Sequence, residues 1–80
     1  MTEAELRRVV VEGLQKAAPE SNPADLGSNQ PIRETLDLDS FDFLNFLIGL
    51  HKTLGVEILE ADYGTLGTID DVVRYLLPKT

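Results

Sequence analysis

Apolar residues recur along this chain at the three- and four-residue spacing of an α-helix, which places them on one face. One such stripe near the N-terminus consists of Leu6, Val9, Val10, Leu14 and Ala17. Thr2 and Glu5 have the spacing of a capping box, in which each side chain satisfies a free backbone N–H at the helix start. The pattern predicts a first helix over residues 3–17, which Pro19 ends.

The most apolar stretch runs from Leu36 to Leu54, and its predicted helix, over residues 40–54, carries two apolar strips. With residues placed about 100° apart, one side gathers Phe43, Phe46, Leu47, Leu50 and Leu54. The second strip consists of Phe41, Leu44 and Ile48. One apolar face is enough to bury a surface helix, so the second strip is either further core or an exposed docking surface. The pattern alone favours neither.

A long segment rich in turn-forming residues, 19–39, separates these two helices. It contains Pro19, Pro23, Gly27 and Pro31, together with several serines and asparagines. A loop of this length is unusual in a small domain and is often functional. Because apolar residues are spaced along it, we expect an ordered crossover, in which residues 23–26 could form a short helical turn.

Two further helical segments follow Gly55, which we expect to cap the C-terminus of the central helix. Residues 59–63 are predicted to form one short helical turn, and residues 68–77 the last helix, with Thr68 as N-cap, Asp71 reaching back and Pro78 ending it. Residues 56–58 alternate like a strand, but no second strand is available for pairing, so we expect an extended connector. The predicted fold is an all-α, four-helix bundle with three main helices and one short one, in a single domain over residues 1–80.

Composition narrows the range of functions. The chain has 80 residues, 42% of them hydrophobic, which suffices for one small core. With 14 acidic and 7 basic residues, the net charge of −7 argues against nucleic acid and anionic membranes as partners. No apolar run is long enough to span a bilayer, and no signal peptide is visible. We therefore expect a cytoplasmic monomer.

Catalytic and metal-binding patterns are not evident. The chain has no cysteine, so any thiol chemistry requires a thiol from elsewhere, and its only histidine, His51, lies in the middle of the central helix. Asp37, Asp39 and Asp42 surround Ser40 and could hold a hard cation weakly, but they lack the spacing of a calcium loop. We expect a protein that is not an enzyme and has no dedicated metal site.

Asp39 and Ser40 lie where the long loop meets the central helix. Asp39 is a good N-cap, and its charge suits the positive end of the helix dipole. Taken alone, an Asp-Ser pair usually does no more than begin a helix. Here a long loop precedes the pair, a broadly apolar helix follows it and the whole chain is acidic, which makes Ser40 a candidate functional residue.

Together these features resemble the acyl carrier protein family. Asp39-Ser40-Phe41 matches the family's Asp-Ser-hydrophobic motif, with Leu36 and Leu38 before it. The GVEI sequence at residues 55–58 resembles the segment after the family's second helix. Further matches without a gap are Leu66, Thr68, Ile69, Asp71, Tyr75 and Leu76. The resemblance covers nearly the whole chain, most securely residues 36–77.

The resemblance implies that a phosphopantetheinyl transferase, using coenzyme A and magnesium, attaches 4'-phosphopantetheine to Ser40, with Asp39 as the motif residue and helix cap. The arm ends in a thiol that holds an acyl group as a thioester and presents it to partner enzymes. The family's partners carry basic patches and contact positions that correspond here to Phe41, Asp42, Leu44 and Ile48. This favours the docking interpretation of the second strip. Positions that line the family's acyl pocket correspond to Leu50, Ile58, Leu66 and Val72, which are equally well interpreted as ordinary core.

The chain departs from the family's fatty-acid carriers in its central helix. Those carriers place several carboxylates there, whereas the later positions here hold Asn45, His51 and Lys52, and only Asp42 remains. Because charge complementarity mainly sets partner choice and encounter rate, we expect a specialised carrier. The expected function is to carry acyl or aminoacyl intermediates in fatty-acid or in specialised acyl, polyketide or peptide-type biosynthesis, and the departures favour a specialised carrier over a housekeeping fatty-acid carrier. An aminoacyl carrier protein loaded by a dedicated ligase is one alternative. The alternative from another class is a small helical interaction module in which Ser40 only caps a helix.

Overall fold

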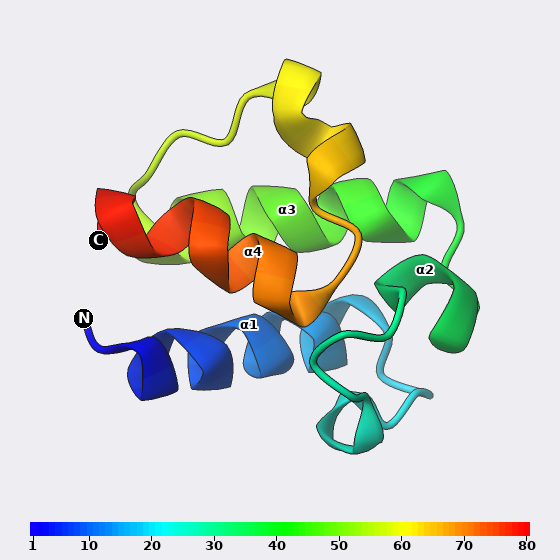
Figure 1. Ribbon diagram of the computed structural model, residues 1–80. Coiled ribbons are helices and arrows are strands. Elements are labelled where there is room, and N and C mark those ends of the chain that lie inside the picture. The colour runs from blue at the N-terminus through cyan, green and yellow to red at the C-terminus, as the bar shows by residue number, and fades with distance from the viewer.

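The computed structural model describes residues 1–80 and consists of helices joined by loops, without a strand. The α-helices are α1 (Glu3–Ala17), α2 (Ile32–Thr35), α3 (Ser40–Leu54) and α4 (Ile69–Leu76). Three 3-10 turns accompany them, η1 (Pro23–Asp25), η2 (Glu60–Thr65) and η3 (Leu77–Lys79). Helix α1 packs against both α3 and α4, as Figure 1 shows. The predicted all-α bundle is therefore confirmed.

The two long helices begin and end where the sequence indicates. Glu5 N–H donates to Thr2 Oγ1 at 3.2 Å and Thr2 N–H donates to Glu5 Oε1 at 3.2 Å, which completes the capping box. The Glu5 carboxylate accepts from Thr2 N–H and, at 2.9 Å, from the Thr2 hydroxyl, and these two hydrogen bonds lower the pKa of Glu5. Gly55 ends α3 with φ of 66°, a left-handed conformation in which glycine lacks the steric penalty of other residues.

Other elements differ in detail from the sequence-based expectation. The short helix α2 was not predicted, and the turn expected over residues 59–63 is the 3-10 turn η2, which continues past Gly64 to Thr65. Pro78 does not end the helical segment. The chain continues after α4 as the 3-10 turn η3, and the first turn of η3 accommodates the proline. Asp71 N–H donates to Thr68 Oγ1 at 3.0 Å, as expected for an N-cap. The Asp71 carboxylate, however, pairs with Arg74 and does not accept from the Thr68 backbone N–H, so the expected capping box is incomplete.

A single core cluster joins the helices. It contains the first apolar strip of α3 except Leu54, which is half-buried, together with residues from every α-helix. Gly13 is where α1 and α3 approach closely, since a Cβ there would lie 3.4 Å from Phe46 Cε1. None of the helices is both long and apolar enough to cross a membrane.

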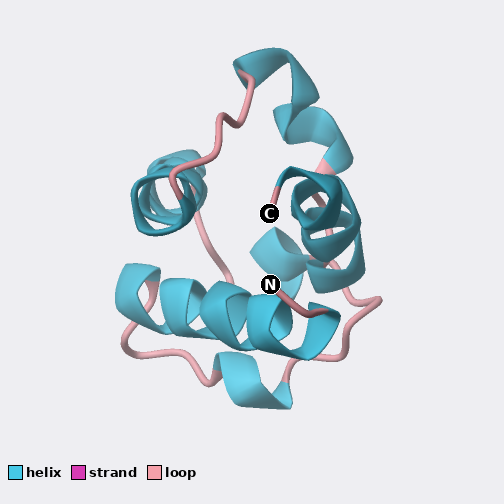
Figure 2. Ribbon diagram, turned by 90° about the vertical axis from the view of Figure 1, so that its left-hand side faces the viewer, coloured by secondary structure: helices cyan, strands magenta, loops and turns pink.

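The long loop is ordered and fixed at several points. Ile32 is fully buried, and its N–H donates to the Gly67 carbonyl at 2.8 Å. Asp70 N–H donates to the Ser28 carbonyl at 2.9 Å. The Asp70 carboxylate pairs with Arg7, and this contact lowers the pKa of Asp70. Figure 2 shows η1 on the outer side of α1, opposite α3 and α4. Ser28 and Ile32, in the middle of the loop, are thus held by hydrogen bonds to the chain around the start of α4.

Candidate functional site

Ser40 is the first residue of α3 and is exposed. Asp39 precedes it in an extended conformation, and Asp39 Oδ1 accepts a hydrogen bond of 2.8 Å from Asp42 N–H. The aspartate therefore caps the helix, as the motif predicts. The Ser40 hydroxyl makes no hydrogen bond to the protein, which leaves its oxygen available at the start of a fifteen-residue helix.

The backbone before Ser40 forms an ordered corner between α2 and α3. Leu38 is 8% exposed, and its N–H donates to the Arg33 carbonyl at 2.9 Å. Asp37 turns the chain with φ of 53°, a conformation that aspartate tolerates better than most residues. These contacts fix the direction in which α3 begins, and hence the position of Ser40.

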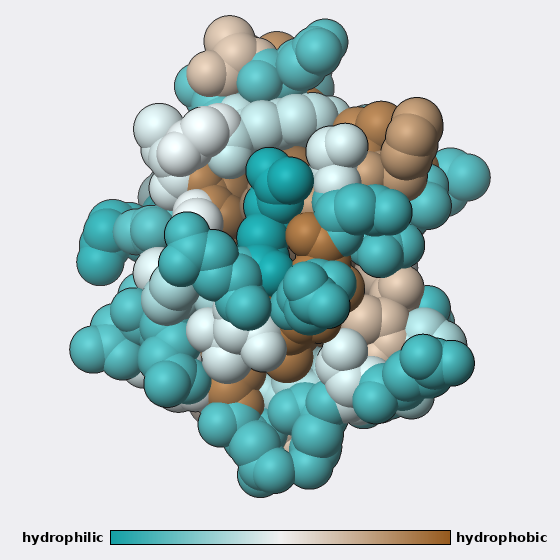
Figure 3. Space-filling model, turned by 90° about the vertical axis from the view of Figure 1, so that its right-hand side faces the viewer, coloured by the Kyte–Doolittle hydropathy of each residue, from teal (hydrophilic) through white to brown (hydrophobic).

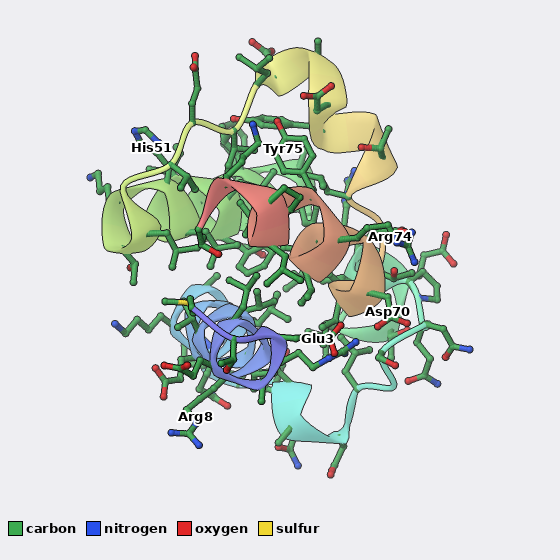
Figure 4. The ribbon with its side chains drawn as sticks, turned by 60° about the vertical axis from the view of Figure 1, so that its left-hand side comes forward. Glu3, Arg8, His51, Asp70, Arg74 and Tyr75 are labelled. Atoms are coloured by element: carbon green, nitrogen blue, oxygen red, sulfur yellow. The ribbon has the colours of Figure 1, made fainter.

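Ser40 lines a cavity of about 210 Å³ between α2, α3 and η2. The other residues that line it are Arg33, Phe43, Leu44, Tyr63 and Gly64. The wall formed by η2 is connected to α4, because Tyr75 donates a hydrogen bond of 2.7 Å to Asp62 Oδ2 and accepts one of 3.4 Å from Leu59 N–H. Figure 4 shows Tyr75 directed from α4 toward the segment that leads into η2. The contact with Asp62 raises the pKa of Tyr75.

The second strip of α3 is largely on the surface. Phe41 is 75% exposed and Ile48 is 38% exposed, whereas Leu44 is half-buried in the wall of the Ser40 cavity. Asp42 is half-buried, with its N–H engaged by the helix cap. Figure 3 shows the side of the molecule at which α3 begins, where apolar atoms are visible between polar side chains. Phe41 is thus accessible next to Ser40, and Ile48 is accessible two turns further along α3.

The structure does not gather the four expected pocket residues around one cavity. Leu50, Leu66 and Val72 are core residues with at most 1% exposure, and Leu50 also borders a cavity of about 180 Å³ between α1 and α3. Ile58 is half-buried and lines a separate cavity of about 130 Å³, together with Leu47, Ile48, His51, Glu57 and Tyr63. His51 Nδ1–H donates to the Val56 carbonyl at 2.6 Å and so fixes the chain after α3.

Sequence reasoning missed four residues of the Ser40 cavity, namely Arg33, Tyr63 and Gly64, together with Phe43, which it assigned to the core strip alone. Tyr63 and Gly64 come from η2, more than twenty residues away, and no local pattern predicts that contact. Arg33 had a usable signal, because it is the only lysine or arginine between Lys16 and Lys52. Asp37, Asp39 and Asp42 do not form a group that could hold a metal ion.

Comparison with known proteins agrees with the motif and the fold. The acyl carrier protein of Campylobacter hominis is 36% identical over 72 residues, which cover 90% of this chain and 85% of the relative. The acyl carrier protein of Wolinella succinogenes is 29% identical over 72 residues, 90% of this chain and 88% of the relative. No protein-family model matches the sequence. Identity of 36% over nearly the full length of both chains is decisive, and the chain belongs to the acyl carrier protein family.

Proposed function

We propose that this protein carries acyl or aminoacyl groups as thioesters on 4'-phosphopantetheine attached to Ser40. The observation that carries the proposal is the free, exposed hydroxyl of Ser40 at the first position of α3, where Asp39 performs the capping. Family membership supports it, since the two relatives are named acyl carrier proteins. When bound, the arm supplies the thiol that a chain without cysteine lacks.

The surroundings of Ser40 fit the attached group. A phosphodiester on Ser40 places a negative charge at the N-terminus of α3, where free N–H groups and the helix dipole stabilise anions. The adjoining cavity offers the apolar surfaces of Phe43 and Leu44 to the first part of the arm. No histidine or carboxylate lines this cavity, so the role proposed for the chain is to hold and present the arm, while partner enzymes catalyse.

Partner enzymes are proposed to dock on Phe41, Asp42, Leu44 and Ile48. The exposure of Phe41 and Ile48 supports this, because exposed apolar side chains on the helix that begins at a modification site provide a contact surface. The net charge of −7 favours basic partners, among them a phosphopantetheinyl transferase and a loading ligase. Asn45, His51 and Lys52 weaken the acidic character of α3, which supports a specialised pathway and partners distinct from those of fatty-acid carriers. The proposed setting is the cytoplasm, with the carrier as a monomer.

The acyl pocket is proposed to open within the core between Leu50, Ile58, Leu66 and Val72. The cavity of about 130 Å³ beside Ile58 is the nearest existing space, and it shares Tyr63 with the Ser40 cavity. An acyl chain that passes Tyr63 would have to displace core side chains around Leu66 to go deeper, because Leu66 is 1% exposed. Cargo length is therefore expected to be limited by the cost of opening a closely packed core.

Intact mass spectrometry tests the proposed attachment. The purified apo-protein is incubated with coenzyme A, magnesium and a promiscuous phosphopantetheinyl transferase, and we expect a gain of one phosphopantetheine group. Ser40→Ala should gain nothing, whereas Ser21→Ala, which removes a hydroxyl from the loop, should be modified normally. An unmodified wild-type protein, or an equal gain in Ser40→Ala, would exclude the carrier function and favour a helical interaction module.

A further inference from the structure

Arg33 is placed beside Ser40 by the short helix α2. The preceding residue, Ile32, is fully buried, and the Arg33 carbonyl accepts from Leu38 N–H at 2.9 Å. The Arg33 side chain extends toward α3, where its Cζ atom lies 5.9 Å from the centroid of the Phe43 ring. This distance is within the range of a cation–π contact, which holds the guanidinium against the helix.

The Arg33 guanidinium has no anionic partner in the structure. The two ion pairs of the protein are Arg7–Asp70 and Arg74–Asp71, and the Arg33 side chain takes part in neither an ion pair nor a hydrogen bond. A guanidinium presents five N–H donors. Five of the seven basic residues form no ion pair, namely Arg8, Lys16, Arg33, Lys52 and Lys79. Arg33 differs from the other four because it lines the Ser40 cavity, where its donors remain available for an anion.

Arg33 and Ser40 line the same cavity. Phe43, which contacts the guanidinium, is three residues after Ser40 and therefore lies on the same side of α3. A phosphate attached to Ser40 has its phosphorus one bond from Oγ, so its free oxygens cannot lie far from the mouth of this cavity. The unpaired cation and the future anion thus adjoin the same cavity.

Charge makes this pairing favourable. Asp37, Asp39 and Asp42 stand within three residues of Ser40, and each repels a phosphodiester added there. Arginine binds phosphate with paired N–H donors in a geometry that lysine cannot reproduce. We propose that Arg33 binds the phosphodiester on Ser40, donating to its free oxygens while the guanidinium stays against Phe43. The proposal rests on the attachment proposed above and assigns the residue that orients the arm.

The consequence is a defined starting direction for the arm. With its phosphate bound to Arg33, the arm leaves Ser40 on the side of α3 that faces η2, next to Leu44 and Tyr63. Without Arg33, the phosphate would be directed only by the N-terminus of α3 and would be repelled by the neighbouring carboxylates. Arg33 is thus a positioning residue for the arm.

Nuclear magnetic resonance on fully modified protein tests the contact. Wild type, Arg33→Gln, Arg33→Lys and Arg8→Gln are converted to the holo form, and intact mass confirms attachment before any spectrum is recorded. Arg8 is the matched control because it is exposed and unpaired on α1, where Figure 4 shows it pointing away from the bundle. The readouts are the phosphorus-31 shift of the phosphodiester and the side-chain Nε–Hε resonance of Arg33, assigned by its loss in apo Arg33→Gln.

We expect the Arg33 Nε–Hε resonance to shift between apo and holo wild type. The phosphorus-31 resonance should move in holo Arg33→Gln, move less in Arg33→Lys, and remain at the wild-type position in Arg8→Gln. High salt should shift the wild-type signal toward that of Arg33→Gln.

Two different failures are distinguishable. If wild type gains no mass, the attachment itself is wrong and the contact falls with it. If wild type is modified but the Arg33 Nε–Hε resonance does not change between apo and holo forms, the contact alone is overturned, whether or not the transferase accepts Arg33→Gln. An equal phosphorus-31 shift in Arg33→Gln and Arg8→Gln would overturn it as well.

Discussion

The Tyr75 hydroxyl of α4 donates a hydrogen bond of 2.7 Å to Asp62 Oδ2 in η2. No residue of η2 is fully buried, so this hydrogen bond, together with the packing of Tyr63 against the core, connects that turn with the bundle. Because Tyr63 and Gly64 of η2 line the Ser40 cavity, the contact also fixes one wall of the site. A substitution at Tyr75 should therefore alter the wall of the Ser40 cavity, although Tyr75 itself does not line that cavity.

Tyr75→Phe should loosen η2 while leaving the rest of the bundle ordered. The substitution keeps the aromatic ring, which is half-buried, and removes the hydroxyl that joins Asp62 and Leu59. We expect faster amide hydrogen exchange in residues 60–66 than in wild type, and unchanged exchange in α1. Uniformly faster exchange across the protein would mean that the substitution lowers global stability instead.

Alkaline pH should weaken the same contact. The hydrogen bond to Asp62 raises the pKa of Tyr75 above its ordinary value of 10.0. The unfolded chain therefore loses this proton at a lower pH than the folded protein, and stability falls as pH rises from about 10 through the folded pKa. Urea unfolding between pH 8 and pH 11 should show this fall in wild type, and Tyr75→Phe should lose the Tyr75 contribution to it.

Two glycines near the end of α3 should respond oppositely to alanine. A Cβ at Gly49 or at Gly55 would meet no atom within 4 Å, so steric contact does not distinguish them. Gly49 lies inside the helix, and Gly49→Ala should raise the free energy of unfolding by about 0.5–1 kcal/mol. Gly55 has φ of 66°, and Gly55→Ala should lower it by about 1 kcal/mol. Urea unfolding of both variants measures the difference, and equal effects would contradict the backbone argument.

Asp39→Ala should destabilise α3 by about 1 kcal/mol, because it removes the acceptor for Asp42 N–H. Asp39→Asn retains a side-chain oxygen and should recover most of that loss in urea unfolding. If the two variants are equally destabilised, the negative charge at the helix dipole matters more than the hydrogen bond.

If partner enzymes dock on the second strip, as proposed, substitutions there should reduce binding of the transferase independently of the stability of the fold. Ile48→Asp places a charge at a position that is 38% exposed, so it should reduce the rate of modification by the transferase while the thermal midpoint changes little. Leu44→Asp should reduce the rate too, but it should also lower the midpoint, because Leu44 is half-buried. Circular dichroism and the modification rate together test this, and an unchanged rate in Ile48→Asp would contradict docking there.

The sequence pattern predicts those helices that are stabilised by interactions between residues close together in the chain. Helices α1 and α3 follow from apolar periodicity over fifteen residues and from caps at Thr2, Asp39 and Gly55. Helix α2 escapes prediction because four residues are too few for a periodic pattern, and its anchor is the long-range hydrogen bond from Ile32 to Gly67. The candidate serine is likewise recognisable from its motif and cap.

The surroundings of Ser40 require the fold. Arg33, Phe43 and Tyr63 meet only because three separate segments converge, and no spacing in the sequence encodes that approach. The pattern also left the second strip undecided between core and surface, whereas the structure exposes Phe41 and Ile48. Burial depends on how many helices cover α3, which is a property of the whole bundle.

The 75% exposure of Phe41 has a consequence for the lifetime of complexes. Its apolar area contributes little to folding of the isolated chain, so most of it remains to be covered by association. Complete burial of a phenylalanine side chain contributes about 2 kcal/mol, which corresponds to about a thirtyfold gain in affinity. A single anchor of this size strengthens an encounter without making it permanent, which suits the proposed role of a carrier that binds several enzymes in turn.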